Sequence, residues 1–221
     1  METVIFDLDG TLADTSADLI AAANASFVQR GFGALLDPEA DRLTAFHGGR
    51  AMLNLGYSRL GREMGEDKVQ EDYLYFLDVY ANNIDRETRL YPGAEAAVEG
   101  LLAKGIKVGI CTNKPEGLAE TLMQRLGVRH LFGSLVGADT LPVRKPDPEP
   151  YLEAVRRVGG DPARSVLIGD TDTDVKTARA VGVPVVLVAF GPEGPGIVRL
   201  GPDALLEHYD GLAGVLGALK F

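Results

Sequence analysis

The chain has 221 residues, enough for one large domain or two small ones with a substantial hydrophobic core. Its formal net charge of −10, from 22 basic and 32 acidic residues, argues against nucleic-acid binding and means that an anionic substrate needs a local cation or metal. The single cysteine, Cys111, excludes an internal disulfide, and no apolar run is long enough to span a membrane. Since the N-terminal residues lack a basic leader-like segment, we expect a cytoplasmic protein.

Short apolar, β-branched runs predict a parallel sheet, because strands covered by helices on both faces are apolar throughout. The predicted strands span residues 3–6, 106–112, 134–136, 165–168 and 184–189. Helical patterns alternate with the later strands, at residues 94–104, 116–126, 148–158 and 172–181. This alternation predicts an α/β fold built on a doubly wound parallel sheet.

Residues 15–89 follow a different pattern. They contain no convincing strand, but they show amphipathic helical segments at 17–30 and 69–82. The simplest account is a helical insertion placed directly after the first strand. We therefore predict two units, an α/β core formed by residues 1–14 and 90–221 and a helical unit formed by residues 15–89.

Two aspartates stand at the carboxyl end of the first predicted strand, where open α/β sheets bind ligands. Asp7 and Asp9 are two positions apart in an extended chain, so their side chains should face the same way. An EF-hand is excluded because Thr11 and Leu12 stand where that loop needs an acidic or amide residue and a glycine. Taken alone, the pair would be interpreted as two solvated carboxylates in a turn.

A second acidic cluster changes that interpretation. Asp170, Asp172 and Asp174 follow the strand at residues 165–168, and one or two of them, but not all three, can serve as caps of the next helix. Carboxylates that converge from two strand ends form a hard, oxygen-rich site suited to Mg²⁺. A metal there would also remove the repulsion between Asp7 and Asp9.

Polar residues follow two other elements. Thr112 and Asn113 end the strand at 106–112 and offer a hydroxyl and a backbone N–H to a phosphoryl oxygen, although Asn113 or Lys114 could equally cap a helix that begins at Pro115. Lys145 lies beside two prolines, as an ordinary loop residue would. It is also the obvious counter-charge for a carboxylate that carries phosphate.

These four pieces occur in a recognisable order. DLDGT, the strand that ends at Thr112, Lys145 within KPDP, and GDTDTD together resemble the four motifs of haloacid dehalogenase superfamily phosphatases. The resemblance covers nearly the whole chain and implies a Rossmann-like core with a helical cap of the C1 type inserted after the first motif. DLDGTLADTSADL and YPGAEAAVEGL are most similar to phosphoglycolate phosphatases.

The resemblance implies a role for each motif residue. Asp7 would attack phosphorus and form an aspartyl-phosphate. Asp9 would protonate the leaving oxygen and then deprotonate the water that hydrolyses the intermediate. Thr112 and Asn113 would hold the transferring phosphoryl group, and Lys145 would screen the charge between Asp7 and the phosphate.

The resemblance also implies a Mg²⁺ site. Asp7, the backbone carbonyl of Asp9, and Asp170 would bind the ion, and Asp174 would support the site. Asp172 would have the least defined role of the acidic cluster.

Substrate choice would come from the helical insertion, because the core contacts only the phosphoryl group. Gly48 and Gly49 permit a close approach of the backbone, and Arg50 could bind a substrate carboxylate through two hydrogen bonds. The alternative is a helix–helix turn with an exposed arginine. For His47 we favour a structural role in such a turn, because a lone histidine is weak evidence of a binding site.

We therefore predict a Mg²⁺-dependent phosphomonoester hydrolase, active as a monomer or homodimer on a small phosphorylated, anionic metabolite, with 2-phosphoglycolate as the first substrate to test. The alternatives within the superfamily are a pyrophosphatase, a sugar-phosphate phosphatase and a phosphomutase. A phospho-receiver signalling module is an alternative of another class. A receiver, however, is much shorter and lacks an aspartate two positions after its phosphorylated one.

Overall fold

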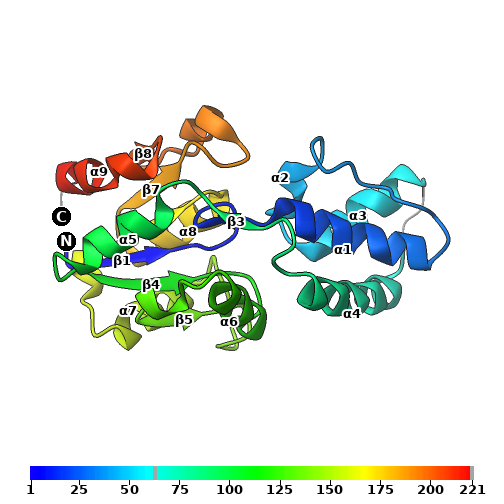
Figure 1. Ribbon diagram of the computed structural model, residues 1–221, viewed down its shortest axis with the longest axis horizontal. Helices are drawn as coiled ribbons and strands as arrows, with labels where there is room; N and C mark the ends of the chain where they lie inside the picture. The colour runs from blue at the N-terminus through cyan, green and yellow to red at the C-terminus, as the bar shows by residue number, and fades with distance from the viewer. Residues whose placement is uncertain (62–63, 220–221) are drawn as a thin grey trace. The chain divides into compact units, whose positions relative to one another are not determined.

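The structure is a computed structural model, and it describes residues 1–61 and 64–219. The chain divides into two compact units, one formed by residues 1–14 and 90–221 and the other by residues 15–89 (Figure 1). No helix in the described ranges is both long and apolar enough to cross a bilayer.

The first unit is built on a six-stranded sheet in the order β5-β4-β1-β6-β7-β8, flanked by helices (Figure 1). Every neighbouring pair of strands is parallel. The strands are β1 (Thr3–Phe6), β4 (Lys107–Cys111), β5 (Ser134–Val136), β6 (Ser165–Gly169), β7 (Val185–Val188) and β8 (Ala204–Leu206). The predicted α/β, Rossmann-like fold is confirmed.

In the described part of this unit, five α-helices and four short 3-10 helices lie between these strands or, for η4 and α9, after the last of them. The α-helices are α5 (Ala94–Leu102), α6 (Glu116–Arg125), α7 (Glu149–Arg157), α8 (Asp172–Val181) and α9 (Leu212–Ala218). The 3-10 helices are η1 (Arg129–Leu131), η2 (Pro162–Arg164), η3 (Gly194–Leu200) and η4 (Tyr209–Gly211). β2 (Ala13–Asp14) and β3 (Arg89–Leu90) form a separate two-stranded sheet.

The sheet is apolar on both faces, and its central strands can therefore be predicted from the sequence. All four residues of β1 and all five of β6 are buried. Tyr151 and Ala154 of α7 and Ala178 of α8 pack into one core with Ile5 and Leu167 of the sheet. Burying a large side chain of this kind contributes roughly 1.5–3 kcal/mol to stability.

The strand order positions a binding crevice. β1 lies at the centre, between β4 and β6, and the connections run outward from it in both directions. In open α/β sheets such a reversal of strand order opens a crevice at the carboxyl ends of the central strands. The residues that follow β1, β4 and β6 therefore gather at one edge.

The described residues of the second unit form four helices, α1 (Ser16–Gln29), α2 (Arg42–Ala45), α3 (Gly49–Arg59) and α4 (Glu66–Asn82). Phe27 of α1 packs edge-on against Tyr57 of α3, with ring centroids 5.4 Å apart. A Cβ at Gly56 would overlap the ring of Phe27, so glycine permits this close packing. The assignment of this unit as a cap over a substrate remains a prediction.

One carboxylate joins the beginning of the second unit to its end. Asp18, in the first turn of α1, is 4% exposed and accepts hydrogen bonds from the backbone N–H of Glu87 at 3.0 Å and of Thr88 at 2.9 Å. The hydroxyl of Thr88 donates a further bond of 2.8 Å to the same side chain. Both ends of the helical unit are thus fixed at one buried side chain.

Candidate active site

The turn after β1 presents two carboxylates. The backbone N–H of Asp7 still donates to the carbonyl of Ile168 in β6, at 2.8 Å, so Asp7 continues the strand by one residue. The chain then turns tightly, and the carbonyl of Leu8 accepts from the backbone N–H of Leu12 at 2.9 Å. Gly10 has a φ of 82°, which a residue with a side chain rarely adopts. The DLDGT motif therefore encodes a sharp exit from the sheet.

Three acidic side chains from two strand ends converge. Asp7, Asp170 and Asp174 each offer a carboxylate oxygen, and these oxygens all lie within 4.8 Å of one another. All three residues are buried. Carboxylates this close repel each other unless a cation lies among them.

Lys145 supplies one positive charge to this cluster. Its ammonium lies 3.1 Å from Asp7 Oδ2 and 2.7 Å from Asp174 Oδ1, and its side chain is 1% exposed. Lysine is almost never so buried unless it is paired. The surface-loop alternative for Lys145 therefore does not fit the structure, and the predicted proximity of Lys145 to Asp7 is what the structure shows.

Burial and the charges of neighbouring groups shift the pKa values of these residues. Burial, with the nearby Asp174 and Asp9 carboxylates adding to it and Lys145 opposing it, raises the pKa of Asp7 to about 6. Burial and the charges of Asp7 and Asp174 also raise the pKa of Asp170 well above its ordinary value. Burial alone would lower the pKa of Lys145, but the charges of Asp174 and Asp7 outweigh it and raise that pKa.

The carboxylates fit a divalent cation. Asp170 Oδ1 accepts a hydrogen bond of 2.9 Å from the hydroxyl of Thr11, whereas the buried Oδ2 of Asp170 has no hydrogen-bond partner among the described residues. An unsatisfied buried carboxylate oxygen is costly in an apolar setting. Oxygen ligands of this kind are those that Mg²⁺ prefers.

Asp174 serves the helix and the cluster at once. It lies at the third position of α8 and forms a capping box with Thr171, whose backbone N–H and hydroxyl donate to Asp174 Oδ2 at 3.1 and 2.8 Å. Its other oxygen accepts from Lys145. A Cβ at Gly169 would overlap the Asp174 carboxylate, so glycine permits this approach. Asp172, in contrast, is half-exposed and pairs with Lys176.

The residues after β4 lie at the same edge of the sheet. Thr112 donates its backbone N–H to the carbonyl of Val136 at 2.9 Å, and its hydroxyl oxygen accepts from the backbone N–H of Lys114 at 3.1 Å. The side-chain amide of Asn113 donates to the carbonyl of Lys145 at 3.0 Å. Asn113 thereby ties the Lys145 loop to β4, and its predicted contact with a phosphoryl group stays a prediction.

The sequence predicted no place in the site for two further side chains at this edge, Thr11 and Lys114. Thr11 contacts Asp170, as described above. The ammonium of Lys114 donates a hydrogen bond of 2.7 Å to Asp9 Oδ1. The sequence places each of them beside a motif residue but gives no signal for the partner, because that depends on how the Gly10 turn folds back.

The predicted substrate residues Gly48 and Arg50 belong to the helical unit. Gly48 has a φ of 92° and directly precedes α3. The guanidinium of Arg50 lies 4.6 Å from the ring centroid of Tyr73 and donates to the side chain of Gln70. The Nδ1 of His47 lies within hydrogen-bond distance of the carbonyl oxygen of Leu43, at 2.9 Å, as expected of a turn residue. The contact of Gly48 and Arg50 with a substrate stays a prediction.

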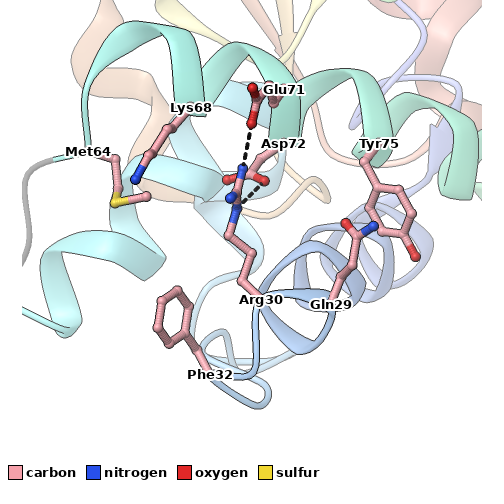
Figure 2. A pocket seen from close by; sticks show the side chains of 8 residues that line it. All are labelled: Gln29, Arg30, Phe32, Met64, Lys68, Glu71, Asp72 and Tyr75. Carbon is pink, nitrogen blue, oxygen red and sulfur yellow. Dashed lines mark hydrogen bonds and ion pairs between the residues drawn. The ribbon is translucent and has the colours of Figure 1, made fainter.

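The helical unit also has a hollow of about 610 Å³ (Figure 2). Arg30 reaches across it and pairs with Asp72 at 2.6 Å and with Glu71 at 3.1 Å. Lys68 is the second basic residue of the lining, so two cations face two carboxylates. This balance gives the hollow no net attraction for an anion. It is lined by Gln29, Arg30, Phe32, Met64, Lys68, Glu71, Asp72 and Tyr75.

A comparison with known protein families identifies the family of this chain. Residues 4–188 match the family model of haloacid dehalogenase-like hydrolases. The chain belongs to this family. The predicted family and the prediction of a hydrolytic enzyme are thereby confirmed.

Curated and solved relatives of this hydrolase carry related names. It is 38% identical, over 95% of its length and 92% of the relative, to a phosphoglycolate phosphatase of Mesorhizobium japonicum. It is 34% identical, over 96% of its length and 91% of the relative, to a phosphoglycolate phosphatase of Agrobacterium fabrum. The crystal structure of a predicted phosphoglycolate phosphatase from Haemophilus somnus superposes with a TM-score of 0.86 at 24% identity, covering 97% of both chains, and supports the fold.

Proposed function

We propose that this hydrolase is a Mg²⁺-dependent phosphatase that cleaves the phosphate ester of a small anionic metabolite, with 2-phosphoglycolate as its first candidate substrate. The observation that carries the proposal is the buried cluster of Asp7, Asp170 and Asp174 around Lys145. The names of the curated relatives support the choice of substrate.

The metal site would use side chains that the structure brings together. Asp7, Asp170 and the backbone carbonyl of Asp9 would hold Mg²⁺, with Asp174 supporting the site through its bond to Lys145. The Oδ2 of Asp170, which has no hydrogen-bond partner among the described residues, supports this choice of ligands. When bound, the ion would supply positive charge that offsets the repulsion between the phosphate and the carboxylates.

The first half of the reaction would be carried by Asp7 and Asp9. A carboxylate oxygen of Asp7 attacks phosphorus as the bond to the leaving oxygen breaks, and Asp9 gives that oxygen its proton. Lys145, 3.1 Å from Asp7, offsets the negative charge that gathers there. The hydroxyl of Thr112, at the same edge of the sheet, is the donor proposed for a phosphoryl oxygen.

The second half would restore the enzyme. A water oxygen attacks the phosphorus of the aspartyl-phosphate, and Asp9, now a carboxylate, takes the proton of that water. The bond between phosphorus and Asp7 breaks, and inorganic phosphate leaves. Each group thus returns to its starting protonation state.

The test is steady-state hydrolysis of a panel of phosphate esters, with and without Mg²⁺. We expect 2-phosphoglycolate to give the highest kcat/KM and chelation of the metal to abolish turnover. A preference for pyrophosphate or a sugar phosphate would change the substrate, and turnover that needs a bisphosphate activator would indicate a mutase. A lasting phosphoryl-enzyme without turnover would indicate a receiver-like module.

The nucleophile is tested by Asp7→Asn, with Asp78→Asn, an exposed residue of α4, as the matched control. We expect Asp7→Asn to keep the fold and lose turnover, because the amide is a poor nucleophile. Asp78→Asn should keep both. Substantial turnover by the Asp7→Asn protein would refute the assignment.

A further inference from the structure

Lys114 is a buried lysine that the reaction described above does not use. It follows β4, its side chain is only 4% exposed, and its ammonium lies 2.7 Å from Asp9 Oδ1. The side chain of Asp9 is 18% exposed, more than that of its partner. Burying a lysine costs free energy that pairing must offset, so the ion pair is the reason that Lys114 can occupy this place.

The backbone of Lys114 is held on both sides. Its N–H donates to the hydroxyl oxygen of Thr112 at 3.1 Å, and its carbonyl accepts from the N–H of Ala138 at 2.9 Å. These two hydrogen bonds hold the backbone that carries the ammonium in place. Such support is what a side chain needs in order to fix the geometry of another.

The two catalytic aspartates contact different cations. Lys145 pairs with Asp7 and with Asp174, whereas Lys114 pairs with Asp9. One lysine thus accompanies the proposed nucleophile and the other accompanies the proposed proton carrier. This separation assigns Lys114 to the step in which Asp9 acts as a carboxylate.

We propose that Lys114 is a positioning residue that holds the Asp9 carboxylate in place for hydrolysis of the aspartyl-phosphate, an inference that rests on the proposed function. After Asp9 gives its proton to the leaving oxygen, the ammonium of Lys114 keeps one carboxylate oxygen at a fixed place. The Asp9 carboxylate then takes the proton of the attacking water, while phosphorus exchanges its bond to Asp7 for a bond to that water oxygen. Without Lys114, the carboxylate would turn towards bulk solvent.

The test is pre-steady-state hydrolysis of p-nitrophenyl phosphate by Lys114→Met. Its leaving group departs without a proton, so the first half of the reaction should stay fast. We expect a burst of about one p-nitrophenol per active site, followed by a steady rate about 10- to 100-fold below that of the wild type. This loss is smaller than the full rate enhancement that general acid–base catalysis supplies, because Asp9 itself is still present. Lys114→Arg, which keeps the charge, should recover most of the steady rate.

Lys107→Met is the matched control, because Lys107 begins β4 and is exposed at the other end of the same strand. It should behave as the wild type does. If Lys114→Met does not fold, as judged by its circular dichroism, Lys114→Gln replaces it. An equal loss of the burst and of the steady rate, or no change in either, would overturn the positioning role.

A direct role in binding substrate gives a different result. If Lys114 bound a carboxylate of the leaving group, its replacement would raise KM for 2-phosphoglycolate and leave KM for p-nitrophenyl phosphate unchanged, with no burst. That outcome would overturn the inference and leave the proposed function standing. If neither the wild type nor Lys107→Met hydrolyses any ester, the proposed function itself fails.

Discussion

Replacing Lys145 with methionine tests whether one ammonium holds the acidic cluster together. The change removes a cation that lies 3.1 Å from Asp7 and 2.7 Å from Asp174, with a side chain that is 1% exposed. Methionine fills a similar volume and adapts to irregular space, so packing should change little. The cluster would be left with the carboxylates of Asp7, Asp170 and Asp174.

The expected loss of stability follows from these contacts. Removing one partner of a buried ion pair costs about 3–5 kcal/mol, because the remaining charges stay buried. Domains have total stabilities of about 5–15 kcal/mol, so the variant should remain folded at neutral pH. With an m-value of about 2 kcal/mol/M, the urea midpoint should fall by roughly 2 M.

The loss should depend on pH in a known direction. Burial already raises the pKa of Asp7 to about 6, and without Lys145 that pKa should rise further. An acid whose pKa is higher in the folded state takes up protons on folding, so its ionisation destabilises the fold as the pH rises. The deficit of Lys145→Met should therefore be larger at pH 8 than at pH 5.

The assay is urea unfolding at both pH values, without divalent metal, followed by circular dichroism. Lys104→Met, at an exposed lysine after α5, is the matched control and should stay within about 0.5 kcal/mol of the wild type. A deficit below about 1 kcal/mol, or one that is equal at the two pH values, would refute the view that Lys145 compensates buried carboxylates.

Two further predictions concern the helical unit. Arg50→Ala should raise KM for carboxylated esters about 10-fold and leave KM for p-nitrophenyl phosphate unchanged, because only the carboxylated esters would pair with the guanidinium. If steady-state assays show equal effects on both substrates, Arg50 has no role in substrate choice. The hydrogen bonds from Arg59 hold the pKa of Asp41 below its usual 3.8. The ion pair is therefore fully present above pH 3.8 and is lost as the pH falls through the lowered value. Asp41→Asn should lower the free energy of unfolding in urea by about 1.5–3 kcal/mol at pH 7, and this deficit should become smaller below pH 3.8. A deficit that stays the same at all pH values would contradict the stabilising role of the ionised Asp41.

The sequence predicts the sheet well because parallel strands need apolar residues on both faces. β1 and β6 are mainly apolar, with one polar residue at the start of each, and both are buried throughout. β8 (Ala204–Leu206) was not predicted, because two of its three residues are only half-buried and its run is short. An edge strand of this kind lacks the strong signal of the central ones.

The site was predictable where strand ends determine it. Asp7 and Asp170 meet because β1 and β6 are neighbours, which follows from the fold class. The contact between Lys114 and Asp9 was not predictable, because it depends on the turn at Gly10 and on a side-chain conformation. The stacking of Arg50 on a tyrosine was missed for the same reason, since it joins residues from two helices.

The bonds of Asp18 have a consequence for how the protein tolerates change. Joining the ends of a long insertion costs entropy that grows slowly with its length. Asp18 binds the backbone of Glu87 and Thr88 inside the helical unit, and β2 pairs with β3 at the two ends of the insertion, so these contacts together hold the ends close to each other. We therefore expect that the helical unit can be lengthened, shortened or replaced as long as these contacts are kept.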